Sequence, residues 1–224
     1  ITGIGNFSCI ACANWIRGNT VHSLVSSNNA VALHVNGIYY NGPTTGGIIE
    51  KNLVHSLTSP STLANVNGIT AGGQTATYQN NMVRLGLDAT GADIATTTPY
   101  NGFLEIAGTN TVIHNTVYIG GTVSGTGASS PTYAYNNNAS LTSTRVIRNN
   151  IFINARGNST TGSSHYAFRN TGTATGLTIN NNIYRSTGTG AVLASFNGAD
   201  QANLAALQAA DGQDANSLTS DPCL

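Results

Sequence analysis

One short motif recurs six times along the chain and limits the possible folds more than any other feature. It consists of an apolar or β-branched residue, two variable positions, Asn, one variable position, and then Val or Ile. Its asparagines are Asn19, Asn52, Asn81, Asn115, Asn149 and Asn181, separated by 33, 29, 34, 34 and 32 residues. A nearly constant period of this length is the signature of a repeat architecture.

A second series of short apolar segments lies between the motifs. Examples are Val31–Val35, Phe103–Ile106 and Ala191–Leu193, and turn-forming Gly, Asn, Ser and Thr separate them from the motifs. Each repeat therefore contains at least two short strands. One repeat cannot bury its apolar side chains alone, so we expect the repeats to stack as coils about 4.8 Å apart. The prediction is an all-β parallel solenoid of about six coils.

The composition fits such stacking. Only 8 basic and 8 acidic residues occur among 224, whereas Asn, Thr, Ser and Gly number 29, 30, 19 and 26. Identical charges stacked in a ladder would repel, whereas an Asn at an inward corner can donate to one coil and accept from another. Asn also tolerates the left-handed backbone of tight turns. We therefore predict a structural Asn ladder formed by the six motif asparagines.

The same composition excludes several classes of protein. No basic patch is available to neutralise nucleic-acid phosphates, and the Glu, Lys and Arg that coiled coils need are scarce. The chain contains no run of about 18 apolar residues, the length that a membrane-spanning helix requires. Because residue 1 is Ile, we expect the chain to be a processed product or an excised piece.

The motif Val146-Ile-Arg-Asn149-Asn-Ile-Phe resembles the repeats of right-handed parallel β-helix proteins of the pectate-lyase-like superfamily. Ser164-His-Tyr-Ala-Phe and Gly212-Gln-Asp-Ala-Asn-Ser-Leu-Thr-Ser-Asp-Pro are similar to stretches of large secreted or cell-surface β-helix proteins of Bacteroidetes-type bacteria. The resemblance implies a right-handed coil and an extracellular or cell-surface location. It does not imply catalysis. The chain departs from that pattern at its end, where Cys223 follows Asp221-Pro.

The repeat predicts one domain over residues 1–224, with coils over 13–198 and a tail over 212–224. Between them we expect a short helix over 200–211, capped by Asp200 and ended by Gly212, with Leu204 and Leu207 on one face. This helix is expected to cover apolar surface on the solenoid. Two longer insertions, 88–100 and 120–131, are interpreted mainly as tolerated loops, with ligand binding as the alternative.

The acidic residues are too scattered for a predicted catalytic pair. Only Asp88 and Asp93 share a loop, so these two together with Glu105 are where a catalytic site would be sought. We expect no catalytic residues, no cofactor and no metal site. Arg17 and Glu50 hold equivalent repeat positions and should pair. His22 and His55 also share one position and are interpreted as an outward ladder.

The row that begins with His22 and His55 continues, by motif spacing, to Tyr118, Phe152 and Tyr184. Strand alternation places the residue after an inward Val or Ile outward. An exposed aromatic strip of this kind could grip sugar rings, so these three residues are a candidate glycan-binding strip, with core packing as the alternative.

The three cysteines lie near the ends of the chain, at Cys9, Cys12 and Cys223. They are interpreted as buried small thiols. The alternative is an intersubunit contact in which Cys223 of one copy meets Cys9 or Cys12 of the next, because an uncapped solenoid exposes strand edges at both ends.

The expected function is a non-catalytic extracellular structural module, such as a surface spacer, an adhesin or a head-to-tail fibre subunit. The alternative is a polysaccharide-binding or polysaccharide-cleaving β-helix domain. Expected partners are therefore further copies of the chain, end to end, or a glycan, and not nucleic acid or membrane.

Overall fold

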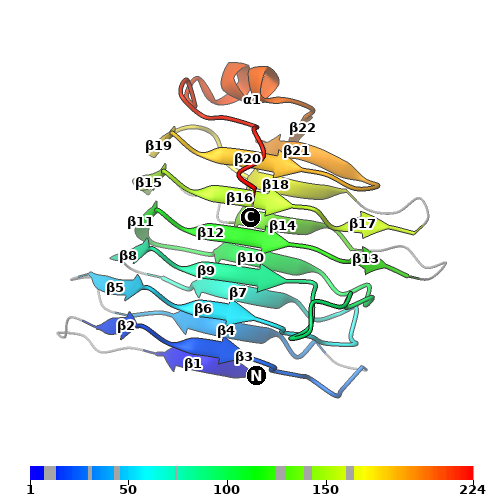
Figure 1. Cartoon of the computed structure of the whole chain (residues 1–224). Coiled ribbons are helices and arrows are strands. Elements are labelled where there is room, and N and C mark those ends of the chain that lie inside the picture. Colours follow the sequence, from blue (N-terminus) through cyan, green and yellow to red (C-terminus); the bar gives the residue numbers. More distant parts are fainter. Residues whose placement is uncertain are drawn as a thin grey trace.

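Each repeat forms three short strands in the computed structural model, which describes residues 1–7, 14–29, 32–42, 46–73, 75–124, 130–138, 143–159 and 164–223. The strands belong to three sheets that run along the solenoid (Figure 1). The apolar residue that opens each motif lies in one sheet, and the Val or Ile that ends it lies in the next.

Sheet A contains β1 (Thr2–Asn6), β4 (Val35–Tyr40), β7 (Val66–Ala71), β10 (Tyr100–Glu105), β14 (Thr132–Asn137), β18 (His165–Asn170), β21 (Ala191–Phe196) and β22 (Ala199–Gln201). Sheet B contains β2 (Trp15–Arg17), β5 (Gly47–Glu50), β8 (Thr75–Gln79), β11 (Thr109–Ile113), β15 (Arg145–Arg148) and β19 (Leu177–Asn180). Sheet C contains β3 (Thr20–His22), β6 (Leu53–His55), β9 (Met82–Leu85), β12 (Thr116–Ile119), β16 (Ile151–Asn154) and β20 (Ile183–Ser186). The two-residue strands β13 (Thr122–Val123) and β17 (Gly157–Asn158) pair separately.

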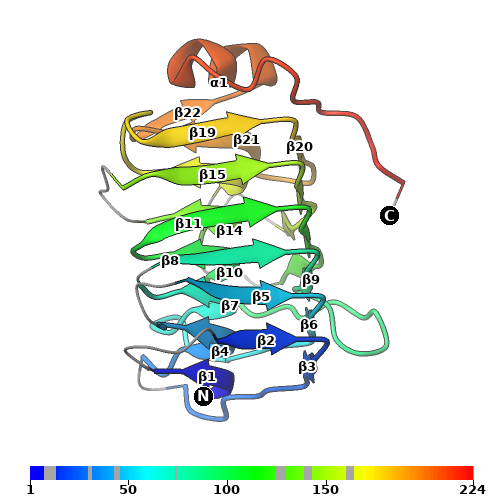
Figure 2. The same ribbon diagram turned by 90° about the vertical axis from the view of Figure 1, so that its left-hand side faces the viewer.

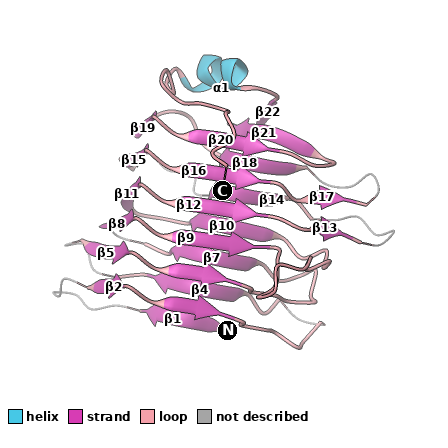
Figure 3. Ribbon diagram, viewed as in Figure 1, coloured by secondary structure: helices cyan, strands magenta, loops and turns pink. Residues whose placement is uncertain are grey.

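The predicted parallel solenoid is confirmed. Every strand pair within sheets B and C is parallel, and in sheet A only β21 and β22 run antiparallel. Sheets B and C each hold six strands, so the chain forms six rungs separated by five steps. Sheet C faces the viewer in Figure 1, and its strands run left to right as the chain climbs from the N-terminus, which is a right-handed coil. The described residues are nearly all strand and loop, and the one helix among them, α1, lies at the upper end (Figure 3).

An unbroken column of aromatic side chains fills the interior. Neighbouring rings are 4.9 to 6.3 Å apart from centroid to centroid, and the column consists of Tyr40, Tyr78, Phe103, Tyr135, Phe168 and Tyr184. Aromatic burial of this kind contributes about 2–3 kcal/mol per ring. Sheet A packs closely on sheet C because several strands of sheet A carry glycine at one inward-facing position. A Cβ on Gly37 would lie 2.3 Å from Val54, and Gly68 and Gly102 are similarly tight.

The predicted Asn ladder runs through the corner between sheets B and C. The Asn19 side chain donates to the Oδ1 atom of Asn52 at 3.0 Å, and Asn52 and Asn81 repeat this contact with the next rung at 2.9 Å. The ladder Asn also donates to a backbone carbonyl one rung below, as Asn81 does to Ile49 at 2.9 Å. These bonds satisfy buried polar atoms that the corner would otherwise leave unpaired.

In the two upper rungs the ladder residues are Asn150 and Asn182, so the assignments of Asn149 and Asn181 are wrong by one residue. Asn115 donates to Asn150 at 3.1 Å, and Asn150 donates to Asn182 at 3.0 Å. Asn149 and Asn181 instead have positive φ angles of 57° and 59° and are exposed. The left-handed turn and the ladder bond therefore belong to two adjacent residues, not to one.

The C-terminal helix is shorter than predicted. α1 spans Leu204–Asp211, and its N-cap is Asn203, whose side chain accepts a hydrogen bond from the Ala206 amide. Asp200, the predicted cap, lies in β22, because residues 199–201 fold back on β21 as an antiparallel strand. Gly212 ends the helix with φ 69°, as expected. Leu207 is fully buried, and α1 covers the upper end of the core (Figure 2).

Candidate functional site

The predicted glycan-binding strip does not exist as an exposed row. Strand pairing places Tyr118 in register with Arg84 below and Ile153 above. Phe152 and Tyr184 pair with each other and with Val117, and both are fully buried. The outward row on sheet C consists of His22, His55, Arg84, Tyr118, Ile153 and Arg185. The error has the same origin as the ladder error, a one-residue shift in the two upper repeats.

A groove of about 530 Å³ nevertheless lies on the outer face of sheet C. Its lining is mainly apolar and comprises Leu53, His55, Met82, Val83, Arg84, Leu87, Thr116 and Tyr118. Met82 is 55% exposed. The His22 and His55 rings stack with centroids 5.1 Å apart, as the interpretation of an outward ladder requires. Burial lowers the pKa of His55, and the charges of His22 and Arg84 lower it further.

The loop between β9 and β10 projects from the solenoid next to sheet C (Figure 2). It follows Leu87, which lines the groove, and hydrogen bonds from distant residues hold it. The guanidinium of the fully buried Arg156 donates to the carbonyls of Ile94 and Thr96 at 2.9 and 2.8 Å. It also lies over the Tyr100 ring, 4.8 Å from the centroid. Thr98 donates to the Ser59 carbonyl at 2.6 Å. The insertion is therefore held in place by hydrogen bonds to distant parts of the solenoid.

Asp88, Asp93 and Glu105, the three acidic residues among which a catalytic site would be sought, each have separate hydrogen-bond partners. Asp88 accepts hydrogen bonds from Thr90 and Ala92 within its own turn, and these bonds lower its pKa. Asp93 accepts from the Thr122 amide at 3.0 Å. Glu105 is fully buried, accepts from Tyr135 and Asn110, and has its pKa raised by burial. None of these hydrogen bonds links one of the three acids to another.

Other polar residues have structural partners. Arg17 and Glu50 form the expected ion pair at 3.0 Å, and Gln79 also donates to Glu50. His165 is fully buried beside Thr132 and Asn158, 2.8 Å from each. Burial, followed by the charge of Arg156, lowers the pKa of His165 to about 4. His165 is therefore neutral at physiological pH.

Two neighbouring carboxyl groups, those of Asp211 and Asp214, lie within the C-terminal segment. Asp214 is fully buried and accepts hydrogen bonds from the hydroxyls of Tyr184 and Ser217. Burial raises the pKa of Asp214 to about 7, and the neighbouring Asp211 raises it as well, against the opposing effect of the Ser217 hydrogen bond. This pair is enclosed in the end of the solenoid and is not open to a polymeric substrate.

The C-terminal segment closes all three sheets. On sheet A, β22 pairs with β21. On sheet B, the Gln213 side chain takes the place of a strand, accepting from the Ile179 amide at 2.7 Å and donating to the Leu177 carbonyl at 3.1 Å. On sheet C, the Leu218 amide donates to the Asn182 carbonyl at 2.8 Å. We call residues 199–218 the terminal cap.

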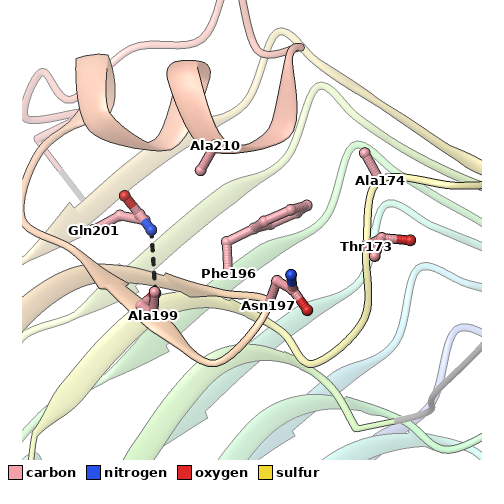
Figure 4. Close-up of a pocket in the computed structure, with 7 residues that line it drawn as sticks. All are labelled: Thr173, Ala174, Phe196, Asn197, Ala199, Gln201 and Ala210. Atoms are coloured by element: carbon pink, nitrogen blue, oxygen red, sulfur yellow. Dashed lines mark hydrogen bonds between the residues drawn. The ribbon is translucent and has the colours of Figure 1, made fainter.

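The terminal cap also ends the Asn ladder. The Asn182 amide donates to the Ser217 hydroxyl at 2.9 Å, where lower rungs use the next Asn. A small cavity of about 340 Å³ remains between the cap and the solenoid, beside Phe196 and Ala210 (Figure 4). The expectation of exposed strand edges at both ends is therefore wrong for the C-terminal end.

Two partly exposed aromatic residues lie outside the sites predicted from the sequence. Tyr133 and Tyr166 lie in register on β14 and β18, and their rings stack 5.3 Å apart on the outer face of sheet A. Regular alternation would place Tyr133 on the same face as Tyr135, because residues two apart in a strand share a face. In both strands the small residue after the outer tyrosine and the aromatic residue after that are buried, so alternation is broken at this point and could not have revealed the outer pair.

Cys223 has an exposed free thiol, so the expectation of a buried thiol is wrong for this residue. Its amide donates to the Asp221 side chain at 3.0 Å, and Asp221 in turn pairs with Arg185 at 3.0 Å. Cys9 and Cys12 lie outside the described residues. Within the described ranges, no three His, Cys, Asp or Glu side chains are grouped so as to hold a metal ion.

No family model, curated protein or solved structure matches this chain. The parallel solenoid is established by its own strand pairing. In the part of the chain that the structure describes, no helix is long and apolar enough to cross a membrane.

Proposed function

We propose that the chain is a non-catalytic structural module, a rigid spacer that closes a β-solenoid at its C-terminal end. The observation that carries the proposal is the terminal cap, because it supplies a hydrogen-bonding replacement for the next rung on each of the three sheets. Exposed edges of parallel strands invite pairing with another chain, and a cap prevents it.

The placement of the acidic residues supports the absence of catalysis. Glycosidase chemistry needs two accessible carboxyl groups a few ångströms apart. Asp88 accepts hydrogen bonds within its own turn, Asp93 accepts from the Thr122 amide, and Glu105 and Asp214 are buried. An extracellular or cell-surface location is part of the proposal and rests on the resemblance of residues 145–222 to surface β-helix proteins. A fibre that grows head to tail is disfavoured, since it needs an open C-terminal end.

The test removes the cap side chains that replace a rung. In the double variant Gln213→Ala, Ser217→Ala, buried amides of β19 and of Asn182 lose their acceptors, which should lower stability by about 2–4 kcal/mol. We expect the variant to self-associate in light scattering at concentrations where the parent chain is monomeric. Asn216→Ala is the matched control, because the hydrogen bond of Asn216 to the neighbouring rung uses its backbone amide.

A double variant as stable and as monomeric as the Asn216→Ala control would contradict the capping role. Separately, incubation of the parent chain with a polysaccharide panel should release neither new reducing ends nor unsaturated sugars. Product formation that scales with protein concentration would overturn the non-catalytic assignment.

A further inference from the structure

The outer face of sheet A changes character between its lower and upper rungs. In the lower rungs, one outward row is an amide ladder in which Asn67 donates to Asn36 at 2.9 Å and Asn101 donates to Asn67 at 2.8 Å. In the next two rungs, Tyr133 and Tyr166 occupy the same row. Both tyrosines are partly exposed, and their rings are within 13° of parallel. The solenoid core does not require aromatic rings on this outer face.

These tyrosines form one side of a cavity of about 280 Å³. The turn between β21 and β22 forms the other side, so the terminal cap builds part of the wall. The lining consists of Tyr133, Tyr166, Arg169, Thr171, Ser195, Gly198 and Asp200. The volume is close to the lower bound of about 300 Å³ seen for small-ligand pockets, which is room for one or two sugar rings.

The polar groups of the cavity are held in position. The Tyr166 hydroxyl donates to Asp200 Oδ1 at 3.0 Å. The Arg169 guanidinium lies over the Tyr133 ring, 4.9 Å from its centroid, and contacts the Asn136 side chain at 3.4 Å. A side chain restrained in this way loses less conformational entropy when a ligand binds.

The charges of the lining residues balance, since Arg169 and Asp200 are the only charged side chains among them. An anionic ligand would have to approach the Asp200 carboxylate, and a cationic ligand would have to approach Arg169. A neutral ligand with many hydroxyl groups can use both, donating pairs of hydroxyls to the carboxylate and accepting from the guanidinium. The tyrosine rings provide an apolar surface for the C–H face of such a ligand.

We propose that this cavity binds one or two hexopyranose residues of a neutral polysaccharide. The site lies on a different sheet from the groove beside the β9–β10 loop, and it adds a ligand to the structural role proposed above. Binding needs no bond cleavage, and the cavity contains one carboxylate where hydrolysis would need two.

The test is isothermal titration calorimetry of the full chain with three probes, cellohexaose, mannohexaose and the anionic hexagalacturonate. We expect at least one neutral hexasaccharide to bind with a dissociation constant in the millimolar range or tighter, and more tightly than hexagalacturonate. Tyr166→Ala and Asp200→Asn should each weaken that binding at least about tenfold, which corresponds to about 1.4 kcal/mol. Tyr118→Ala and Asp221→Asn are matched controls on sheet C and the tail, and both should bind like the parent chain.

Circular dichroism and thermal unfolding of each variant separate loss of the site from loss of the fold. The proposal is overturned if neither neutral probe binds at concentrations up to about 5 mM. It is also overturned if binding survives both site variants, or if hexagalacturonate binds more tightly than the neutral probes.

Discussion

At the scale of single residues, two adjacent residues have different roles at the corner between sheets B and C: one makes the turn and the other makes the ladder bond. One residue of each pair takes the left-handed conformation, and in successive rungs these are Gly18, Lys51, Asn80, His114, Asn149 and Asn181. The residue that follows is always the ladder Asn. The left-handed position therefore accepts Gly, Lys and His as well as Asn, whereas the ladder position accepts only Asn.

Where two asparagines occur in succession, the repeat motif assigns the wrong one to the Asn ladder. The motif required Val or Ile at its last position, which selected Ile151 and Ile183. In the two upper rungs that inward position is instead filled by Phe152 and Tyr184, so the correct frame begins one residue later. Periodicity alone could not decide this, because both frames give nearly the same spacing.

The two neighbours should respond differently to substitution. Asn150→Ala removes the acceptor of the Asn115 amide and side chain and the donor to Val112 and Asn182, so we expect a loss of about 3 kcal/mol or more. Asn149→Gly keeps the left-handed turn and should change stability by less than about 0.5 kcal/mol. Urea unfolding followed by circular dichroism measures both, and equal effects of the two substitutions would contradict the assignment.

At the scale of elements, strands were easier to predict than the segments that join them. The short apolar segments located β7, β10, β14, β18 and β21 of sheet A, but they did not predict β1 or β22. The loop between β9 and β10 could not be interpreted from its composition, because its anchor is Arg156, more than 50 residues away in the sequence. The start of α1 was placed too early because the hairpin of β21 and β22 has no counterpart in the repeat.

The anchoring of this loop can be tested directly. Arg156→Met keeps much of the side-chain volume but removes the donors to Ile94 and Thr96, so the carbonyls of the loop lose their partners. We expect faster amide hydrogen exchange over residues 86–99 and a lower unfolding temperature. Arg148→Met, at an exposed Arg on β15, is the control and should leave exchange in the loop unchanged. Unaltered exchange in Arg156→Met would show that other contacts hold the loop.

At the scale of the whole molecule, two buried groups should contribute to how stability depends on pH between about 4 and 7. The pKa of Asp214 is raised to about 7 from an ordinary value of 3.8. Its stabilising contribution is therefore complete below the ordinary value and is lost as the pH rises through about 7. The pKa of His165 is lowered to about 4, so its contribution is present above 6.5 and is lost as the pH falls toward 4.

The variant Asp214→Asn isolates the first effect, because an amide stays neutral at every pH. Between pH 5 and 8 the unfolding temperature of the parent chain should fall relative to that of Asp214→Asn, by several degrees if a few kcal/mol are involved. Differential scanning calorimetry at fixed ionic strength gives the comparison. Parallel curves for the two proteins over this range would contradict the raised pKa of Asp214.

The number of rungs and their parallel stacking could be predicted from the repeat, but the way the solenoid ends could not. The terminal cap depends on Gln213, Asp214 and Ser217, which occur once and lie outside the period. A side chain that takes over the hydrogen bonds of a missing strand does not recur with the repeat, so it cannot be found from the period of the sequence. The cavity beside Tyr133 and Tyr166 was missed for a related reason, since one of its walls belongs to the cap.

The Asn ladder gives the molecule a direction along its axis. Each ladder side chain donates to the Asn of the next rung toward the C-terminus, so these Asn-to-Asn bonds all run in one direction. The side chain of the last ladder residue, Asn182, donates to the Tyr184 hydroxyl at 3.0 Å, and that hydroxyl donates to Asp214, so the series of side-chain donors ends at a carboxyl group. Rungs could thus be inserted or deleted within the series without changing its sense, and the length of such a solenoid could vary in evolution while one acidic terminus is retained.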